Sequence, residues 1–143
     1  MQYKRAFTLL EVLVVVIIVG ILASLGIINY TPVKERALEK EARSNLQLIS
    51  AAEKIRRMES NDNTYVACQC NDSVDCNNTT NGCNYLLKLS LVKNEWDYTV
   101  TTASSGGATN NTFTATATRK RGVNQNETIT LNQSDTWGGT FTP

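Results

Sequence analysis

The sequence predicts an α+β fold, in which a small antiparallel β-sheet packs on the C-terminal half of a long N-terminal α-helix. An apolar run followed by an amphipathic stretch with helical periodicity occupies residues 7–58. After residue 95, short runs alternate Thr with apolar or aromatic residues, a pattern typical of half-buried antiparallel strands. At 143 residues the chain has room for one ordinary domain.

The apolar run over residues 7–28 is long enough to be a membrane anchor. Its 22 residues would form a helix of about 33 Å, and a bilayer core is ~30 Å thick. Lys4 and Arg5 precede it and predict a cytoplasmic N-terminus with the rest of the chain exported. We assign residues 7–32 to a transmembrane or filament-core half-helix.

Two simpler interpretations of this run compete with a more specific one. A cleaved signal peptide has a shorter apolar core and a small-x-small cleavage site, which residues 23–26 match poorly. An ordinary anchor does not account for Glu11, because a carboxylate inside a membrane helix costs about 2.5–3.5 kcal/mol and usually has a partner. A third interpretation gives Glu11 a role.

Residues 4–11, Lys-Arg-Ala-Phe-Thr-Leu-Leu-Glu, resemble the processing site of type IV pilins and their relatives. In that family a short basic leader ends in a small residue, a membrane peptidase cuts before Phe and methylates the new amine, and Glu stands fifth in the mature chain. Cleavage between Ala6 and Phe7 would place Glu11 fifth. The resemblance covers about residues 1–58 and includes the Gly-Ile-Leu-Ala run at 20–23, Tyr30 and the stretch 42–53.

The resemblance implies a structural protein rather than an enzyme. Residues 1–6 would be the leader, and the mature chain would wait in the inner membrane before joining an extracellular filament of identical subunits. The implied partners are a prepilin peptidase, an assembly platform protein and an ATPase. Within a packed bundle, the carboxylate of Glu11 would pair with the amine of Phe7 in its own or a neighbouring subunit. A pseudopilin of a type II secretion or competence system and a monomeric anchored binding module are the alternatives.

The chain departs from the family pattern at two places. Ala6 stands where the family usually has Gly, and the Pro that many pilins carry in the apolar run is missing, with Pro32 further on. We expect Pro32 to interrupt or kink the helix. Gly20 and Gly26 each lower helix propensity by ~1 kcal/mol relative to Ala, which makes them soft points.

Residues 33–58 predict an amphipathic half-helix that continues the first. Its apolar residues recur at three- and four-residue steps, which is the spacing of one helix face: Ala37, Leu38, Ala42, Leu46, Ile49, Ala52 and Ile55. We expect this face to form the core with the aromatic and apolar residues of the following sheet. The expected contacts join Leu46, Ile49 and Ile55 to Trp96, Tyr98, Phe113, Ile129 and Trp137.

Residues 59–143 form the predicted head, and residues 59–95 are its Cys-rich loop. The four cysteines are Cys68, Cys70, Cys76 and Cys83, and an even number in an exported chain indicates disulfides. Cys68 and Cys70 are too close to favour pairing together, which leaves Cys68–Cys76 with Cys70–Cys83, or Cys68–Cys83 with Cys70–Cys76. A four-Cys zinc site is the alternative, although this spacing is not a common zinc pattern. Oxygen ligands for calcium would come from Asn71, Asp72, Asp75 and Asn77, but their spacing is not that of an EF-hand.

Residues 96–143 predict a sheet of three or four antiparallel strands. The alternating runs are 96–100, 112–118 and 128–131, with turns expected at 104–107 and 121–124.

Composition excludes several function classes. The chain has no His, which removes Ser-His-Asp and Cys-His nucleophile systems and the HExxH zinc proteases. We therefore expect no catalytic site and no cofactor. The net charge of +1 gives no bulk case for nucleic acid. Arg119, Lys120 and Arg121 form the one basic cluster of the exported part, and we expect a solvated hairpin tip there rather than a contact to DNA phosphates.

Overall fold

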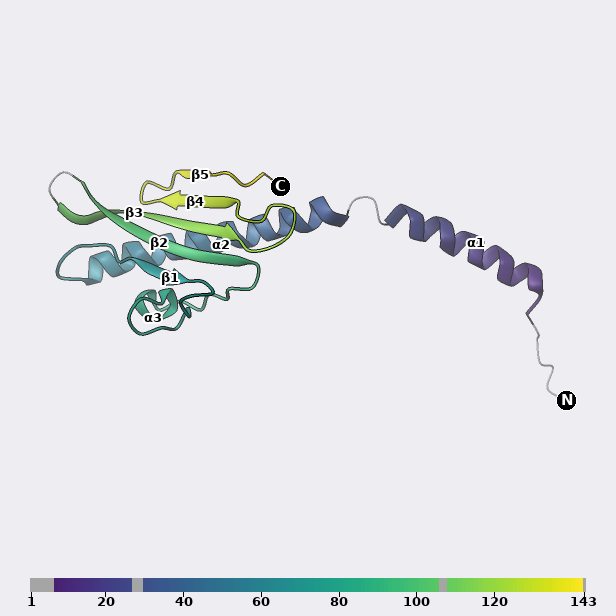
Figure 1. The fold of residues 1–143 in the computed structure, drawn as a ribbon, viewed down its shortest axis with the longest axis horizontal. Helices are drawn as coiled ribbons and strands as arrows, with labels where there is room; N and C mark the ends of the chain where they lie inside the picture. Colours follow the sequence, from purple (N-terminus) through teal and green to yellow (C-terminus); the bar gives the residue numbers. More distant parts are fainter. Residues whose placement is uncertain (1–6, 27–29, 106–107, 143) are drawn as a thin grey trace. The chain divides into compact units, whose positions relative to one another are not determined.

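The N-terminal helix α1 spans Leu9–Gly26 in a computed structural model that describes residues 7–26, 30–105 and 108–142 (Figure 1). The helix begins after Thr8, whose hydroxyl oxygen accepts a hydrogen bond from the backbone N–H of Glu11 at 3.3 Å. It ends at Gly26, one of the soft points. The chain divides into two units, residues 1–35 and residues 36–143, which are described here separately.

The second helix, α2, spans Tyr30–Glu59. Pro32 lies in its first turn rather than interrupting or kinking it, because a backbone N–H is not needed for a helical hydrogen bond there. The basic residues Arg56 and Arg57 lie in the last turn, where the helix dipole favours positive charge. The expected continuity between the two half-helices depends on residues 27–29, which lie outside the described part of the chain.

A five-stranded antiparallel sheet forms most of the second unit, in the order β1-β2-β3-β4-β5, and it confirms the predicted α+β class (Figure 1). Its strands are β1 (Cys68–Cys70), β2 (Trp96–Ser105), β3 (Ala108–Arg119), β4 (Thr128–Asn132) and β5 (Trp137–Gly139), and the short helix α3 (Cys83–Leu87) lies between β1 and β2. The sheet has more strands than expected because β1 and β5, with three residues each, are too short to show an alternating pattern.

Strand alternation places bulky residues of β2 and β4 on the same buried face as the small residues Ala115 and Ala117 of β3. Ala117 of β3 is the partner of Tyr98 on one side and of Ile129 on the other. The small side chain between two large ones lets both reach the helix that the sheet covers. The Thr residues between these positions, such as Thr116, lie on the opposite face of the sheet.

The core lies between the sheet and one face of α2, where Ala42, Leu46 and Ile49 are fully buried. Ile55, expected on this face, is instead 53% exposed. Nine residues at 100° each place Ile55 about 180° away from Leu46, on the other side of the helix.

The expected burial of Trp137 is also corrected. Its side chain is 36% exposed on β5, where its ring lies under the guanidinium group of Arg43 at 4.8 Å from the ring centre.

Candidate assembly surface

Helix α1 exposes its large apolar side chains on every side. Their exposed fractions run from 44% at Val14 to 84% at Leu9. Soluble monomers rarely expose contiguous apolar surface on this scale, and such surface normally marks contact with another protein or with lipid. Among the described residues, the structure contains no helix with the length and apolar character needed to cross a bilayer.

The start of α1 places the expected assembly residue in the first helical turn. Glu11 is the third residue after Thr8, and Ser/Thr-x-x-Glu is the pattern of a capping box. The backbone N–H of Glu11 donates both to the side-chain oxygen and to the backbone oxygen of Thr8, at 3.3 and 3.1 Å. A carboxylate at this end also interacts favourably with the helix dipole. Phe7, the residue before Thr8, is 78% exposed. Ala6 and the expected leader lie outside the described residues.

A second apolar stripe runs along α2 on the side away from the sheet. Leu48 and Ile55 are about half exposed, and Met58 is 77% exposed. Leu48 and Ile55, together with the segment Leu86–Leu89, border a groove of about 530 Å³. The residues that line the groove are Leu48, Ala51, Ala52, Ile55, Arg56, Glu59, Leu86, Leu87, Lys88 and Leu89.

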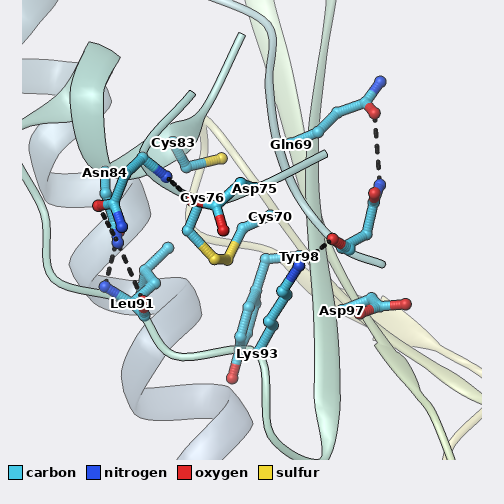
Figure 2. Close-up of a disulfide and its surroundings, with 12 residues drawn as sticks. Gln69, Cys70, Asp75, Cys76, Cys83, Asn84, Leu91, Lys93, Asp97 and Tyr98 are labelled. Carbon is cyan, nitrogen blue, oxygen red and sulfur yellow. Dashed lines mark hydrogen bonds between the residues drawn. A yellow bond between two sulfur atoms is a disulfide. The ribbon is translucent and has the colours of Figure 1, made fainter. Parts of the chain in front are cut away.

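Two disulfides hold the Cys-rich loop against the sheet. Of the two pairings that the sequence leaves open, the structure has Cys68–Cys83 and Cys70–Cys76, which leaves no cysteine for zinc. Figure 2 shows the Cys70–Cys76 bridge. Cys68 and Cys70 are two residues apart on β1, so both point to its buried side. From there Cys68 bonds to Cys83 at the start of α3, and Cys70 bonds to Cys76 in the loop before α3.

Asn84 completes this arrangement from α3 (Figure 2). Its side-chain oxygen accepts from the N–H of Leu91 at 2.7 Å, and its side-chain amide donates to the carbonyl of Leu91 at 3.0 Å. Its backbone N–H donates to the carbonyl of Cys76 at 2.8 Å. These three hydrogen bonds hold the segment between α3 and Leu91 against the disulfide-bonded loop, although that segment has no regular secondary structure.

The oxygens considered for calcium are used by the loop itself. The side-chain oxygen of Asn71 accepts from the backbone N–H groups of Ser73 and Val74, and that of Asp75 accepts from the N–H of Asn77. Asp72 forms an ion pair with Lys120, which lowers the pKa of its carboxyl group. Across the described residues no three acidic, Cys or His side chains gather in a way that could hold a metal ion.

The basic cluster at the end of β3 is not a free surface patch. Arg119 is 1% exposed, donates to the Glu95 carboxylate at 2.7 Å and lies over the ring of Trp96. The alternation of β3 continues to Arg119 and places its side chain on the buried face of the sheet. The expectation of a solvated hairpin tip is therefore wrong for Arg119. Lys120 pairs with Asp72 and, at 3.5 Å, with Asp97, whereas Arg121 is exposed.

Sequence reasoning missed two polar contacts that join α2 to the sheet side of the head. Lys54 donates to both carboxylate oxygens of Asp135 at 2.7 Å. The side-chain amide of Asn45 donates to the hydroxyl of Tyr98 at 2.7 Å, and burial raises the pKa of Tyr98 to about 12. The partners are 53 and 81 residues apart, and no local pattern indicates such pairs.

Comparisons with known proteins agree with the geometry of the N-terminal region. Residues 1–27 match the family model described as the prokaryotic N-terminal methylation motif. The chain is 42% identical over 51 residues to the type IV major pilin protein PilA of Myxococcus xanthus (strain DK1622), and 44% identical over 52 residues to the type II secretion system core protein G of Klebsiella pneumoniae.

These similarities are confined to part of each protein. Each alignment covers 36% of this chain, but 23% of the Myxococcus pilin and 37% of the Klebsiella protein. No solved structure matches the chain. By its N-terminal region, the chain is similar to type IV pilins and pseudopilins.

Proposed function

We propose that the protein is a structural subunit of a type IV pilus-like filament and polymerises through α1. The observation that carries this proposal is the exposure of α1 on all sides. A helix that is apolar all round is buried in a larger assembly or in lipid. A filament built from identical copies provides that cover, because each α1 is surrounded by those of its neighbours.

Before assembly, the subunit would wait in the inner membrane with α1 in the lipid. A prepilin peptidase would cut between Ala6 and Phe7 and methylate the new amine of Phe7. The match to the N-terminal methylation motif supports this step. A platform protein and an ATPase would then move the subunit into the filament on the cell surface.

Glu11 would set the register between neighbouring subunits. Inside an apolar bundle its carboxylate needs a positive partner, and the amine created at Phe7 supplies one. Removing one member of a buried ion pair costs about 3–5 kcal/mol, whereas its presence fixes a specific arrangement. This role is compatible with the capping position of Glu11, since the cap uses its backbone N–H and leaves the carboxylate for the pair.

The second stripe of α2 would extend the contact between subunits beyond α1. Leu48 and Ile55 are presented away from the core of their own head, along a groove with an apolar floor. A helical filament needs heterologous contacts, in which different surfaces of the same chain meet. The groove offers one such surface on the head.

A pseudopilin of a secretion system is the second candidate, and the similarity to the type II secretion core protein G supports it. Both candidates use the same assembly chemistry at α1. Nucleic acid is not proposed as a partner, because Arg119 and Lys120 are engaged in ion pairs within the head.

The test compares filament yield for substitutions at Glu11. We expect Glu11→Gln to reduce filaments sharply and Glu11→Lys to reduce them further, because the latter sets two positive groups together. Processed subunit should persist in the membrane, since the cut lies before the substituted residue. Electron microscopy of sheared surface filaments and immunoblots of membrane fractions measure the two quantities. Glu41→Lys, an exposed position on α2, is the matched control and should form filaments. Normal filaments from Glu11→Lys would contradict the proposed role of this residue.

A further inference from the structure

Glu53 is a carboxylate enclosed in the core of the head. It lies on the sheet-facing side of α2, four residues after Ile49, and its exposed fraction is 0%. Acidic side chains are almost never fully buried unless they are paired, because removing a charge from water is costly. Neither the filament assembly nor the processing proposed above uses this residue.

One carboxylate oxygen of Glu53 binds the backbone of the connection between α2 and β1, residues 60–67. Its Oε2 accepts a hydrogen bond from the backbone N–H of Val66 at 3.1 Å. Oε1 is buried too and has no hydrogen-bond partner among the described residues. The carboxyl group therefore holds residues 64–66 against the helix while half of its own hydrogen-bonding capacity is unused.

The charged groups around Glu53 do little to offset its burial. Arg57 is directed to the carbonyl of Asn63 and to the hydroxyl of Tyr65, both at 3.0 Å. Lys54 binds Asp135 of the turn between β4 and β5. Arg56, three residues along α2, favours the charged form of Glu53 through its positive charge.

An aromatic contact packs the connection against the sheet. The Tyr65 ring, next to Val66, meets Phe113 of β3 edge to face with centroids 4.7 Å apart. Full burial of Glu53 itself stabilises a neutral carboxyl group better than an ionised one.

We propose that the Glu53 carboxyl group holds the α2–β1 connection against α2 in a pH-dependent way. In mildly acidic solution the buried group is neutral and stabilises the head. Above neutral pH it is ionised and destabilises the head. Burial raises the pKa of Glu53 to about 7, and the Val66 hydrogen bond and the charge of Arg56 lower it in part. The proposal goes beyond the filament role and does not depend on it.

The direction of the effect follows from linkage. The folded head binds the proton more tightly than the unfolded chain, where the pKa is 4.5, so protonation stabilises the fold. This contribution is complete below pH 4.5 and is lost as the pH rises through 7. The difference between the two pKa values of Glu53, about 7 in the folded head and 4.5 in the unfolded chain, corresponds to a factor of roughly 300 in the ratio of folded to unfolded chain. Asp62, Asp72 and Asp135, whose pKa values are lowered, act on the acid side of this window and in the opposite direction.

The experiment measures urea unfolding of the full-length oxidised chain in detergent micelles between pH 5 and 8. Tryptophan fluorescence reports unfolding of the head, because both tryptophans lie in it, Trp96 1% exposed and Trp137 36% exposed. We expect the wild-type midpoint to fall from pH 5 to pH 8. Glu53→Gln should remove most of this fall and give a higher midpoint than the wild type at pH 8. Glu59→Gln removes an exposed carboxylate from the same helix and should keep the wild-type pH profile.

A wild-type midpoint that is equal at pH 5 and pH 8, or a Glu53→Gln chain with the wild-type pH profile, would overturn the proposal. If Glu53→Gln does not fold, the wild-type chain still decides the question. A carbon-13 titration of the Glu53 side chain, assigned through its backbone, should show a midpoint above 6. A midpoint near 4.5 would refute the proposal without any variant.

Discussion

The two disulfides are expected to contribute unequally to the stability of the head. The perturbation is removal of one bridge at a time, as the pair Cys68→Ala and Cys83→Ala, or the pair Cys70→Ala and Cys76→Ala. Ala avoids placing a hydroxyl in the core, where all four sulfurs are buried. The two double variants therefore lose comparable packing and differ mainly in the loop that each bridge closes.

The magnitude follows from the loop lengths. The bridge between Cys68 and Cys83 closes a sequence separation of 15, and in the chain-entropy model such a loop is worth about 3 kcal/mol. The bridge between Cys70 and Cys76 closes a separation of 6, worth about 2 kcal/mol. Because the short loop is nested inside the long one, the inner bridge shortens the path that the outer bridge closes. The difference between the variants should therefore be somewhat below 1 kcal/mol.

The assay is urea unfolding of each oxidised full-length chain in micelles, followed by tryptophan fluorescence. Loss of the Cys68–Cys83 bridge should lower the midpoint more than loss of the Cys70–Cys76 bridge. The wild-type chain after reduction, measured with alkylated thiols, should be the least stable of the set. A larger cost for the inner bridge than for the outer one would refute the argument from loop length.

Two further predictions test the core and the processing site. Leu46→Ala, at a fully buried position, should destabilise the head by about 2–5 kcal/mol in the same unfolding assay, whereas Leu48→Ala, at a position 48% exposed, should cost well under half as much; equal costs would contradict the assignment of the two faces of α2. Mass spectrometry of assembled filaments should find a mature chain that starts at an N-methylated Phe7, and recovery of Met1 or Gln2 from assembled material would contradict cleavage after Ala6.

The parts of the fold that the sequence predicts are those with a repeating pattern. The alternation of residues 112–118 predicts the central part of β3, and the Thr residues do lie opposite the apolar ones. The three- and four-residue steps of α2 predict the buried positions Leu46 and Ile49. The same steps also led to Ile55, because several three- and four-residue intervals in succession drift around the helix until they reach its other face.

The parts that could not be predicted depend on contacts between distant segments. The disulfide pairing follows from the side of β1 on which Cys68 and Cys70 lie, and β1 is recognised as a strand only by its pairing with β2. The burial of Arg119 depends on Trp96 at the start of the neighbouring strand and on Glu95 just before it. The role of Glu53 has no local sequence signal, because its hydrogen-bond partner Val66 lies 13 residues further along the chain.

The alternation in the sheet has a consequence for which residues of the head can change without loss of the fold. Ala117 and Tyr98 are held by their partners in the core, so changes there are costly. Thr116 and its neighbours on the outer face meet no core residue, and substitutions at such positions usually change stability by less than about 0.5 kcal/mol. The outer-face Thr residues of β2, β3 and β4 can therefore change at little cost in stability, whereas the buried residues that alternate with them cannot. Related heads are therefore expected to keep the same fold beneath surfaces that share little recognisable identity.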